Sequence, residues 1–370
     1  MALQELRIAG YRSLRNVRLP LQSLNVITGP NGSGKSNLYR ALWLMARVSE
    51  GDFASSISRE GGLPSALWAG PRTDKKSVRM SLGFQTNDLS FEMSCGYPQP
   101  GSSMFAWDAR IKEEMLWIGR TRKPTTTLLE RRGGHTLARD ADGNLAEFAL
   151  SLSDNESVLS QLRDPVRFPV LYSMRDEIRG WRFYHGFRTD DHAPMRLPRI
   201  SALTPVLAHD GGDMAAALQT IREIGDSDRL SQLIDLAFPG RELEILISGQ
   251  PDQRPPPHAP ELCVGLRASD LRRVLHAREL SDGTLKFLCL LAALMSPRPP
   301  AMLALNEPEA SLHPDLLEPL AQLIVAASEH SQIVVCTHSE TLVLSIEEHA
   351  EIAPIRLELQ DGETVIQGKM

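Results

Sequence analysis

The octapeptide at positions 29–36 constrains the fold of this chain more than any other feature of its sequence. It reads Gly-Pro-Asn-Gly-Ser-Gly-Lys-Ser and matches the pattern G-x-x-x-x-G-K-[ST] at every fixed position. A short apolar run at 24–28 precedes it, and Leu38, Leu42 and Met45 follow at helical spacing. A strand, a glycine-rich loop and a helix in this order open an α/β unit, so we expect an α/β fold.

The chemistry expected of this loop is the binding of phosphate. Glycines let backbone N–H groups converge on phosphate oxygens, and the N-terminus of the following helix favours negative charge. Lys35 is expected to neutralise the β- and γ-phosphates of a nucleotide, and the Ser36 hydroxyl to bind Mg²⁺. The predicted phosphate-binding residues are Gly29, Pro30, Asn31, Gly32, Ser33, Gly34, Lys35 and Ser36. A chance match in a surface loop would not follow a strand and open a helix, so we prefer the nucleotide interpretation.

A second apolar strand, expected at 301–305, ends in the polar run Asn306-Glu307-Pro308-Glu309. Glu307 is placed to orient or deprotonate the attacking water. Asn306 stands where an aspartate normally supports Mg²⁺, and its amide oxygen can take that place through a bound water but carries no charge. Apolar strands that end in acidic residues are common, but beside a phosphate-binding loop this one predicts an ATPase.

Two further motifs border apolar elements in the C-terminal part of the chain. Leu280-Ser281-Asp282-Gly283-Thr284 precedes an expected buried helix at 285–295. Its hydroxyl, glycine backbone and helix N-terminus suit a γ-phosphate, although the same letters describe an ordinary turn and N-cap. Cys336-Thr337-His338-Ser339 ends the next apolar strand, at 332–336. His338 is either a structural hydrogen-bonding residue or a group that reaches the γ-phosphate.

The order of these motifs resembles the ABC-type AAA ATPases of the RecF/OLD-like and SMC-like group. The resemblance covers about residues 1–48 and 278–345 and includes the opening Gly-Tyr-Arg-Ser-Leu at 10–14. It implies that Ser281 and Gly283 form the signature that binds ATP across a head-to-head dimer, and that His338 is the switch histidine. It also implies roles for Arg12 near the nucleotide phosphates, Asn37 in the phosphate-binding loop, Ser311 and His313 in a loop that crosses the dimer interface, and Gln85 as a Mg²⁺ contact.

The long middle of the chain separates the two motif regions. Residues 1–50 and 260–370 are expected to form one ABC-type P-loop NTPase core of mixed sheet and helices, with 51–259 as an inserted α+β subdomain. Coiled-coil arms of the SMC type are not expected, because 51–259 lacks sustained heptads. The residues after His338 are too few for the nuclease domain of OLD-type proteins, so the resemblance implies a stand-alone ATPase head.

Local patterns predict several elements outside the motifs. Glycines and prolines separate strand-like runs such as 78–85, and Gly10 is expected to break the first strand. The apolar period lengthens toward helix around 144–162 and 214–238. The remaining predictions are an exposed connector at 251–260, an amphipathic helix at 316–327 and a hairpin turn at Asp361-Gly362 between 355–359 and 364–367.

Composition and charge limit the class of protein. With 42% hydrophobic residues, 23% charged residues and a net charge of −6, the chain has an ordinary globular composition. Its longest apolar run, 287–295, is too short to cross a bilayer, and no secretory signal opens the chain. The four cysteines lie far apart without a CxxC pair. We therefore expect a cytoplasmic protein with reduced thiols and no membrane partner.

An acidic chain does not indicate nucleic-acid binding as a whole, so any such surface must be local. The stretch 163–199 holds eight arginines with aromatic residues interleaved, among them Trp181, Phe183, Tyr184 and Phe187. It is either a surface of arginines and stacking aromatics or, as we favour, a partly buried face of a subdomain. A second basic cluster, expected at the rim of a hairpin, comprises Arg120, Arg122, Lys123, Arg131 and Arg132.

The sequence thus predicts an enzyme that hydrolyses the phosphoanhydride of ATP, with Lys35, Glu307 and His338 as catalytic residues and Mg²⁺ as cofactor. The resemblance implies a homodimer that closes around two ATP·Mg²⁺ and acts on DNA or a partner protein, in DNA repair, recombination or anti-phage defence. Two alternatives stay open. One is a nucleotide-gated binding module with little hydrolysis, motivated by Asn306, and the other is the ATPase subunit of a transporter.

Overall fold

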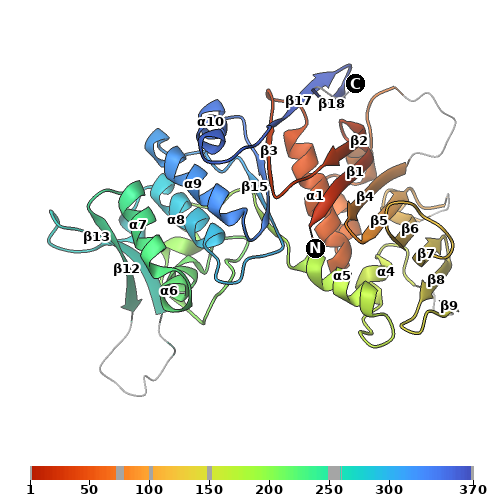
Figure 1. Ribbon diagram of the computed structural model, residues 1–370, viewed down its shortest axis with the longest axis horizontal. Helices are drawn as coiled ribbons and strands as arrows, with labels where there is room; N and C mark the ends of the chain where they lie inside the picture. The colour runs from red at the N-terminus through yellow and green to blue at the C-terminus, as the bar shows by residue number, and fades with distance from the viewer. Residues whose placement is uncertain are drawn as a thin grey trace. The chain divides into compact units, whose positions relative to one another are not determined.

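The chain divides into two compact units in the computed structural model, which describes residues 2–71, 79–99, 103–147, 152–248, 259 and 261–367. Unit 1 comprises Met1–Trp181 and Ile355–Met370, and unit 2 comprises Arg182–Pro354. Each unit mixes strands and helices, which confirms the predicted α/β class (Figure 1). The division into an ATPase core and an insertion at 51–259 stays a prediction.

A large antiparallel sheet is the main element of unit 1, and short hairpins connect most of its strands. Its order is β2-β1-β4-β5-β6-β7-β8-β9. The strands are β1 (Leu3–Tyr11), β2 (Leu14–Pro20), β4 (Arg79–Thr86), β5 (Leu89–Gly96), β6 (Arg110–Ile118), β7 (Thr127–Arg132), β8 (His135–Arg139) and β9 (Leu145–Glu147).

The predicted break of the first strand at Gly10 is wrong, because β1 continues to Tyr11. Gly10 has a φ of +73°, and a Cβ at this position would lie 2.5 Å from the Arg79 carbonyl oxygen. A glycine is therefore required where β1 approaches β4, and it does not end the strand.

Unit 1 also holds the strand that leads into the phosphate-binding loop. Strand β3 (Leu24–Thr28) pairs in parallel with β17 (Ile355–Gln360), which forms the predicted hairpin with β18 (Glu363–Ile366). Asp361 and Gly362 make the turn with φ values of +50° and +80°. The helices of this unit are α1 (Lys35–Glu50), α2 (Phe53–Arg59), α3 (Leu63–Ala66), α4 (Val158–Gln161) and α5 (Pro169–Arg179).

Unit 2 contains three parallel strands with helices between them. Strand β15 (Met302–Asn306) pairs with β10 (Arg182–Tyr184) on one side and with β16 (Gln332–Cys336) on the other. Four of the five residues of β15 and all of β16 are buried, as the continuous apolar runs predict. Helices α8 (Asp282–Leu294), α9 (Leu317–Ala327) and α10 (Glu340–His349) pack in sequence, α8 on α9 and α9 on α10 (Figure 1).

A second, smaller sheet completes unit 2. It consists of β11 (Arg199–Ile200), β13 (Glu261–Ala268) and β12 (Arg241–Ser248) in that order, with β14 (Leu275–His276) also paired to β13. Helices α6 (Met214–Ile224) and α7 (Ser227–Ala237) pack against this sheet, α6 on β13 and α7 on β12. Three 3₁₀ turns connect elements of the unit: Pro194–Arg196, Ala277–Glu279 and Pro314–Leu316.

The structure differs from one local prediction and leaves another mostly outside the described residues. The helix expected around 144–162 is wrong over most of its length: β9 pairs with β8, and only α4 is helical, with 148–151 outside the described residues. The turn at 140–143 starts this pairing, because Asp140 accepts hydrogen bonds from two backbone N–H groups after it, those of Asp142 and Asn144. The connector predicted at 251–260 lies outside the described residues except for Ala259.

Two findings bear on the expected class of protein. All four cysteines are free and buried. Among the described residues, no helix has both the length and the apolar character needed to cross a bilayer.

A buried ion pair fixes the segment before α4 to the large sheet. The side chains of Glu114 and Arg131 are 0% and 1% exposed. Glu114 accepts hydrogen bonds from the Ser157 hydroxyl and the Val158 N–H, and burial is the main reason why its pKa is raised. Arg131, predicted to lie on a basic rim, instead donates to the carbonyl oxygens of Ser153 and Glu156, each at 2.8 Å.

Replacing Arg131 with methionine is expected to lower the free energy of unfolding by about 3–5 kcal/mol, because the buried Glu114 carboxylate loses its charged partner and the carbonyl oxygens of Ser153 and Glu156 lose a donor. Arg132→Met is a matched control at the next position of β7, where the side chain is 59% exposed. We expect it to change the free energy by less than about 1 kcal/mol. Urea denaturation followed by circular dichroism measures both, and equal losses would contradict the assigned role of Arg131.

Candidate functional site

The phosphate-binding loop connects β3 to α1 as predicted, and two of its glycines are required by packing. A Cβ on Gly29 would lie 2.3 Å from the carbonyl oxygen of Leu357 in β17. A Cβ on Gly34, the N-cap of α1 with a φ of +103°, would lie 2.1 Å from the Thr364 hydroxyl oxygen in β18. The hairpin β17–β18 therefore packs directly against the loop and leaves space there only for glycine.

The polar groups of this loop fit a phosphate. The Lys35 ammonium group donates to the carbonyl oxygens of Gly29 at 2.6 Å and Pro30 at 3.0 Å, so the lysine folds back over the loop. The Ser33 hydroxyl is buried without a hydrogen-bond partner, and Ser36 is exposed in the first turn of α1. No acidic residue lies in that turn, so the positive end of the helix dipole is not neutralised.

Arg12 and Asn37 lie together next to the loop. Arg12 has a φ of +48°, forms an ion pair with Glu60 at 2.8 Å and donates to the Asn37 side-chain oxygen at 3.4 Å. Asn37 in turn donates to the Ser13 hydroxyl at 2.8 Å. Gln85 is in a different setting: it is buried in β4, and its side-chain oxygen accepts from Arg7 at 2.8 Å.

Asn306 is the last residue of β15, in register with Cys336 of β16, and Glu307 follows it. The Asn306 side-chain oxygen is buried without a partner, a feature that suits a metal-bound water. Glu307 has a φ of +48°, and its N–H donates to the Cys336 carbonyl oxygen at 2.8 Å. The two residues thus bring an uncharged oxygen ligand and a half-buried carboxylate to one edge of the sheet.

His338 lies between two carboxylates in unit 2. Its Nδ1 is 3.6 Å from Glu307 Oε1 and 3.5 Å from Glu309 Oε1. Glu309 is buried: its Oε1 accepts from the Thr337 hydroxyl at 2.5 Å and the His338 N–H at 3.3 Å, while its Oε2 is buried without a partner. No role is assigned to Glu309 from the sequence. Its position two residues after Glu307 is the one feature of the sequence that points to it.

The signature residues form the start of α8. Ser281 is the N-cap, and its hydroxyl oxygen accepts from the Thr284 N–H at 3.2 Å, as the simple turn interpretation requires. Ser281 is nevertheless exposed, as the predicted contact with the nucleotide of a second copy requires. Ser311, with a φ of +65°, and His313 are also exposed.

Arg196 holds the loop before the signature in place, and sequence reasoning missed it. Its guanidinium is nearly buried, with a side chain that is 7% exposed. It donates to the carbonyl oxygens of Thr189 and Leu280, each at 2.8 Å, and to the Asp282 carboxylate at 2.6 Å; further acceptors are the carbonyl oxygens of Ala277 and Arg278. Its only signal was membership of the arginine-rich stretch 163–199.

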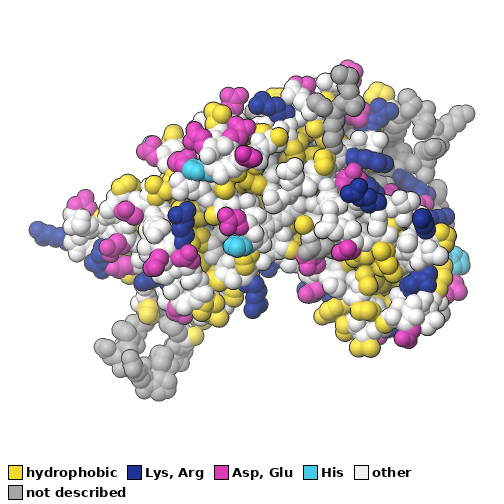
Figure 2. All heavy atoms as spheres, viewed as in Figure 1, with side chains coloured by type: hydrophobic (Ala, Val, Ile, Leu, Met, Phe, Trp, Pro, Cys, Tyr) yellow, Lys and Arg dark blue, Asp and Glu magenta, His cyan; other side chains and the backbone are white. Residues whose placement is uncertain are grey.

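The four aromatic residues that the stacking interpretation relied on are not available to nucleic acid. Trp181, Phe183 and Tyr184 are at most 3% exposed, and Phe187 is 9% exposed. The interpretation of 163–199 as a stacking surface is therefore wrong, and the partly buried face is confirmed. On the face of unit 2 seen in Figure 2, acidic and basic side chains alternate without a continuous basic surface. Arg120, Arg122 and Lys123 are exposed in the β6–β7 connection.

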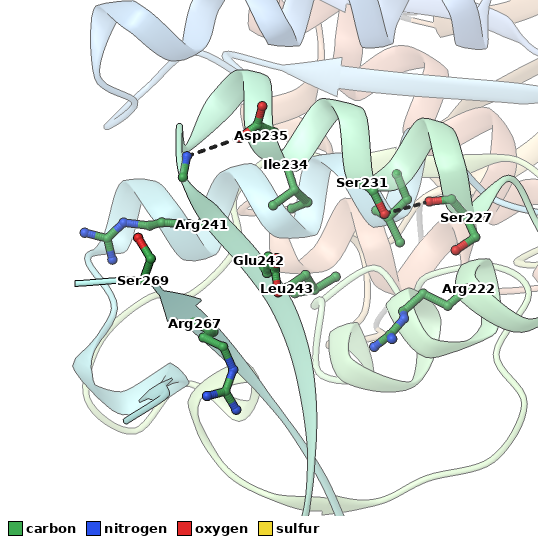
Figure 3. A pocket seen from close by; sticks show the side chains of 12 residues that line it. Arg222, Ser227, Ser231, Ile234, Asp235, Arg241, Glu242, Leu243, Arg267 and Ser269 are labelled. Carbon is green, nitrogen blue, oxygen red and sulfur yellow. Dashed lines mark hydrogen bonds between the residues drawn. The ribbon is translucent and has the colours of Figure 1, made fainter. Parts of the chain in front are cut away.

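A cavity of about 670 Å³ lies elsewhere in unit 2, between α6 and α7 on one side and β12 and β13 on the other (Figure 3). Arg222, Arg241 and Arg267 line it together with acidic and hydroxyl side chains. None of the predicted site residues is among its lining residues.

Comparisons with known proteins identify the family and the fold. The sequence model of a family of AAA domains, whose description names an AbiEii toxin and a Type IV TA system, matches residues 24–345. The structure of an SmcHead bound to the C-winged helix domain of ScpA matches with a TM-score of 0.55 and 14% identity, covering 99% of this chain and 97% of that chain. A Smc head domain with an extended coiled coil, bound to the C-terminal domain of ScpA derived from Pyrococcus furiosus, matches with a TM-score of 0.51 and 13% identity, covering 98% and 95%. No curated protein matches the chain. At these identities the structural likeness shows an ABC-like P-loop NTPase fold.

Gly34→Ala is expected to destabilise the protein by about 2 kcal/mol more than Gly32→Ala, because only the first places a Cβ against another side chain. Both glycines have a positive φ, but a Cβ on Gly32 would meet nothing within 4 Å. Urea denaturation of both variants measures the difference. Thr364→Ala in the Gly34→Ala background should restore part of the loss, and no restoration would contradict the proposed clash.

Proposed function

We propose that this chain, which belongs to the AAA domain family and is an ABC-like AAA ATPase of the SMC, RecF and OLD type, binds ATP with Mg²⁺ and hydrolyses it. The phosphate-binding loop is the observation that carries this proposal. Its glycines, its lysine and the N-terminus of α1, which has no acidic residue in its first turn, form a binding site that suits a triphosphate.

The residues expected around the phosphates and Mg²⁺ have distinct proposed roles. Lys35 turns from its own backbone carbonyls to the β- and γ-phosphates, and the loop N–H groups and Asn37 hold the phosphates in place. Ser36 and Asn306 hold Mg²⁺, with Gln85 as a further candidate ligand. When bound, Mg²⁺ offsets the negative charge of the phosphates. Arg12 adds a positive charge near them, which its ion pair with Glu60 partly balances.

The residues of unit 2 are proposed to act on the attacking water and the γ-phosphate. Glu307 accepts a proton from the water, and His338 contacts the γ-phosphate. The pairing of His338 with Glu307 and Glu309 supports this role, because it holds the imidazole beside the carboxylate that acts on the water.

We further propose that two copies of the chain form a homodimer around two ATP molecules. Ser281 and Gly283 of one copy would contact the nucleotide of the other, and Ser311 and His313 would lie at the interface. The exposure of Ser281, Ser311 and His313 supports this arrangement. The binding of ATP would then close the dimer, and a partner protein or DNA would respond to the closure, in DNA repair, recombination or phage defence. The ScpA domains bound to the Smc heads named above support a protein partner.

Asn306 favours a second candidate function, a nucleotide-gated binding module with little hydrolysis. An amide supplies an oxygen ligand but no charge, so the support of Mg²⁺ is weaker than with an aspartate.

Wild-type protein is expected to release phosphate from ATP, and Asn306→Asp to raise kcat by about tenfold, or about 1.4 kcal/mol of activation free energy. A steady-state phosphate-release assay measures both, with Lys35→Ala as the control that removes the phosphate-neutralising amine. An inactive wild type that aspartate rescues would favour the binding module, whereas strong turnover without the substitution would exclude it. Repeating the assay with duplex DNA, single-stranded DNA and no nucleic acid tests DNA as the effector.

Glu307→Gln is expected to trap an ATP-bound dimer, because glutamine keeps the size of the side chain but cannot accept the proton of the water. Size-exclusion chromatography with and without ATP measures the change in mass. Glu348→Gln, an exposed position in α10, is the matched control and should behave as the wild type. A monomeric Glu307→Gln variant in both conditions would contradict the dimer.

A further inference from the structure

The turn that carries Glu307 is strained and is held from several sides. A φ of +48° is unfavourable for a glutamate and persists only where surrounding contacts enforce it. The Glu307 N–H donates to the Cys336 carbonyl oxygen at 2.8 Å, and its carbonyl oxygen accepts from the Ala310 N–H at 3.1 Å. The backbone on both sides of the proposed catalytic carboxylate is therefore anchored.

Lys286 of α8 supplies a further anchor to this turn. Its ammonium group donates to the Glu307 carbonyl oxygen at 3.1 Å and to the Ala310 carbonyl oxygen at 2.7 Å. The side chain is half-buried, and burial lowers its pKa while the charges of Glu309 and Glu307 act in the opposite direction. A charged donor in such a place makes strong hydrogen bonds with carbonyl groups.

The same helix contacts the turn at a second point. A Cβ on Gly283 would lie 2.8 Å from the Ser311 carbonyl oxygen, so the first turn of α8 rests against the residue that ends the segment 307–311. Lys286 lies three residues further along α8 and five residues after Ser281. Residues such as Leu285 and Phe287 pack the rest of α8 into the core.

We propose that Lys286 is a positioning residue that couples the signature end of α8 to the Glu307 carboxylate of the same chain. A shift of α8, caused when Ser281 contacts the nucleotide of the second copy, is passed through the two hydrogen bonds of Lys286 to the Glu307 turn. The inference rests on the proposed function of Ser281 and Glu307 and adds the link between them. Each active site would then respond to the nucleotide bound at the other.

Three variants test this coupling through turnover. Lys286→Met keeps the length of the side chain without its donors and should lower kcat at least tenfold, with the Kd for ATP within twofold of wild type. Lys286→Arg should retain at least a third of the wild-type kcat. In the Glu307→Gln background, Lys286→Met should lower the residual turnover no further, because the lysine acts through Glu307. Lys123→Met, at an exposed lysine, is the matched control.

Hydrogen exchange tests the same link without turnover. The amides of Ala310 and Leu312, which donate to the Glu307 and Glu309 carbonyl oxygens, should exchange at least threefold faster in Lys286→Met. Adding ATP to the Glu307→Gln variant should slow this exchange, and Lys286→Met should abolish that response.

Three results would overturn the proposal: equal loss of kcat in both backgrounds, unchanged turnover in Lys286→Met, or amide exchange that ignores Lys286. A wild type without turnover refutes hydrolysis instead, and the exchange measurements then still decide whether Lys286 links α8 to the turn.

Discussion

The phosphate-binding loop leaves no space for a side chain where the last hairpin of the chain packs against it. Thr364 is the centre of this packing: its hydroxyl lies beside Gly34 and is 2.7 Å from the Ser13 hydroxyl, and its N–H donates to the Ser13 carbonyl oxygen. One residue near the end of the chain thus joins the β1–β2 turn to the start of α1. The shape of the loop depends on this contact between the two ends of the chain.

The polar groups of the candidate site in unit 2 are placed by the pairing of two parallel strands. These groups lie at the carboxyl ends of β15 and β16, which parallel pairing in register brings together. Asn306 ends β15 and Glu307 follows it, while Thr337 and His338 follow β16. Residues 302–305 and 333–336 are apolar and buried, so the polar residues of the site begin where these runs stop. Buried oxygen atoms of Asn306 and Glu309 lack partners there, a cost that folded proteins accept mainly where a ligand or water completes the site.

The sequence predicted the elements whose signals are local. The strand and helix around the phosphate-binding loop, the buried strands β15 and β16, and the Asp361-Gly362 hairpin each follow from a pattern of a few neighbouring residues. The expected helix around 144–162 failed because a turn at Asp140 extended a hairpin through β9, and pairing outweighed the helical spacing.

The candidate site was predictable in its motifs and not in its supports. Glu309, Lys286 and Arg196 act through contacts with residues that are distant in the sequence or with backbone carbonyl groups, which leave no pattern in the chain. The requirement for glycine at position 34 was expected for phosphate binding, but the side chain that enforces it comes from β18.

The environment of Arg196 restricts how this region can evolve. A guanidinium offers five N–H donors in one plane, whereas an ammonium offers three, so lysine cannot satisfy the acceptors grouped around Arg196. Several of these acceptors are main-chain oxygens, which any residue supplies. The residues that provide them can therefore be substituted without loss of the hydrogen bonds to Arg196. Related chains can therefore diverge around this arginine and still present the signature loop in the same form.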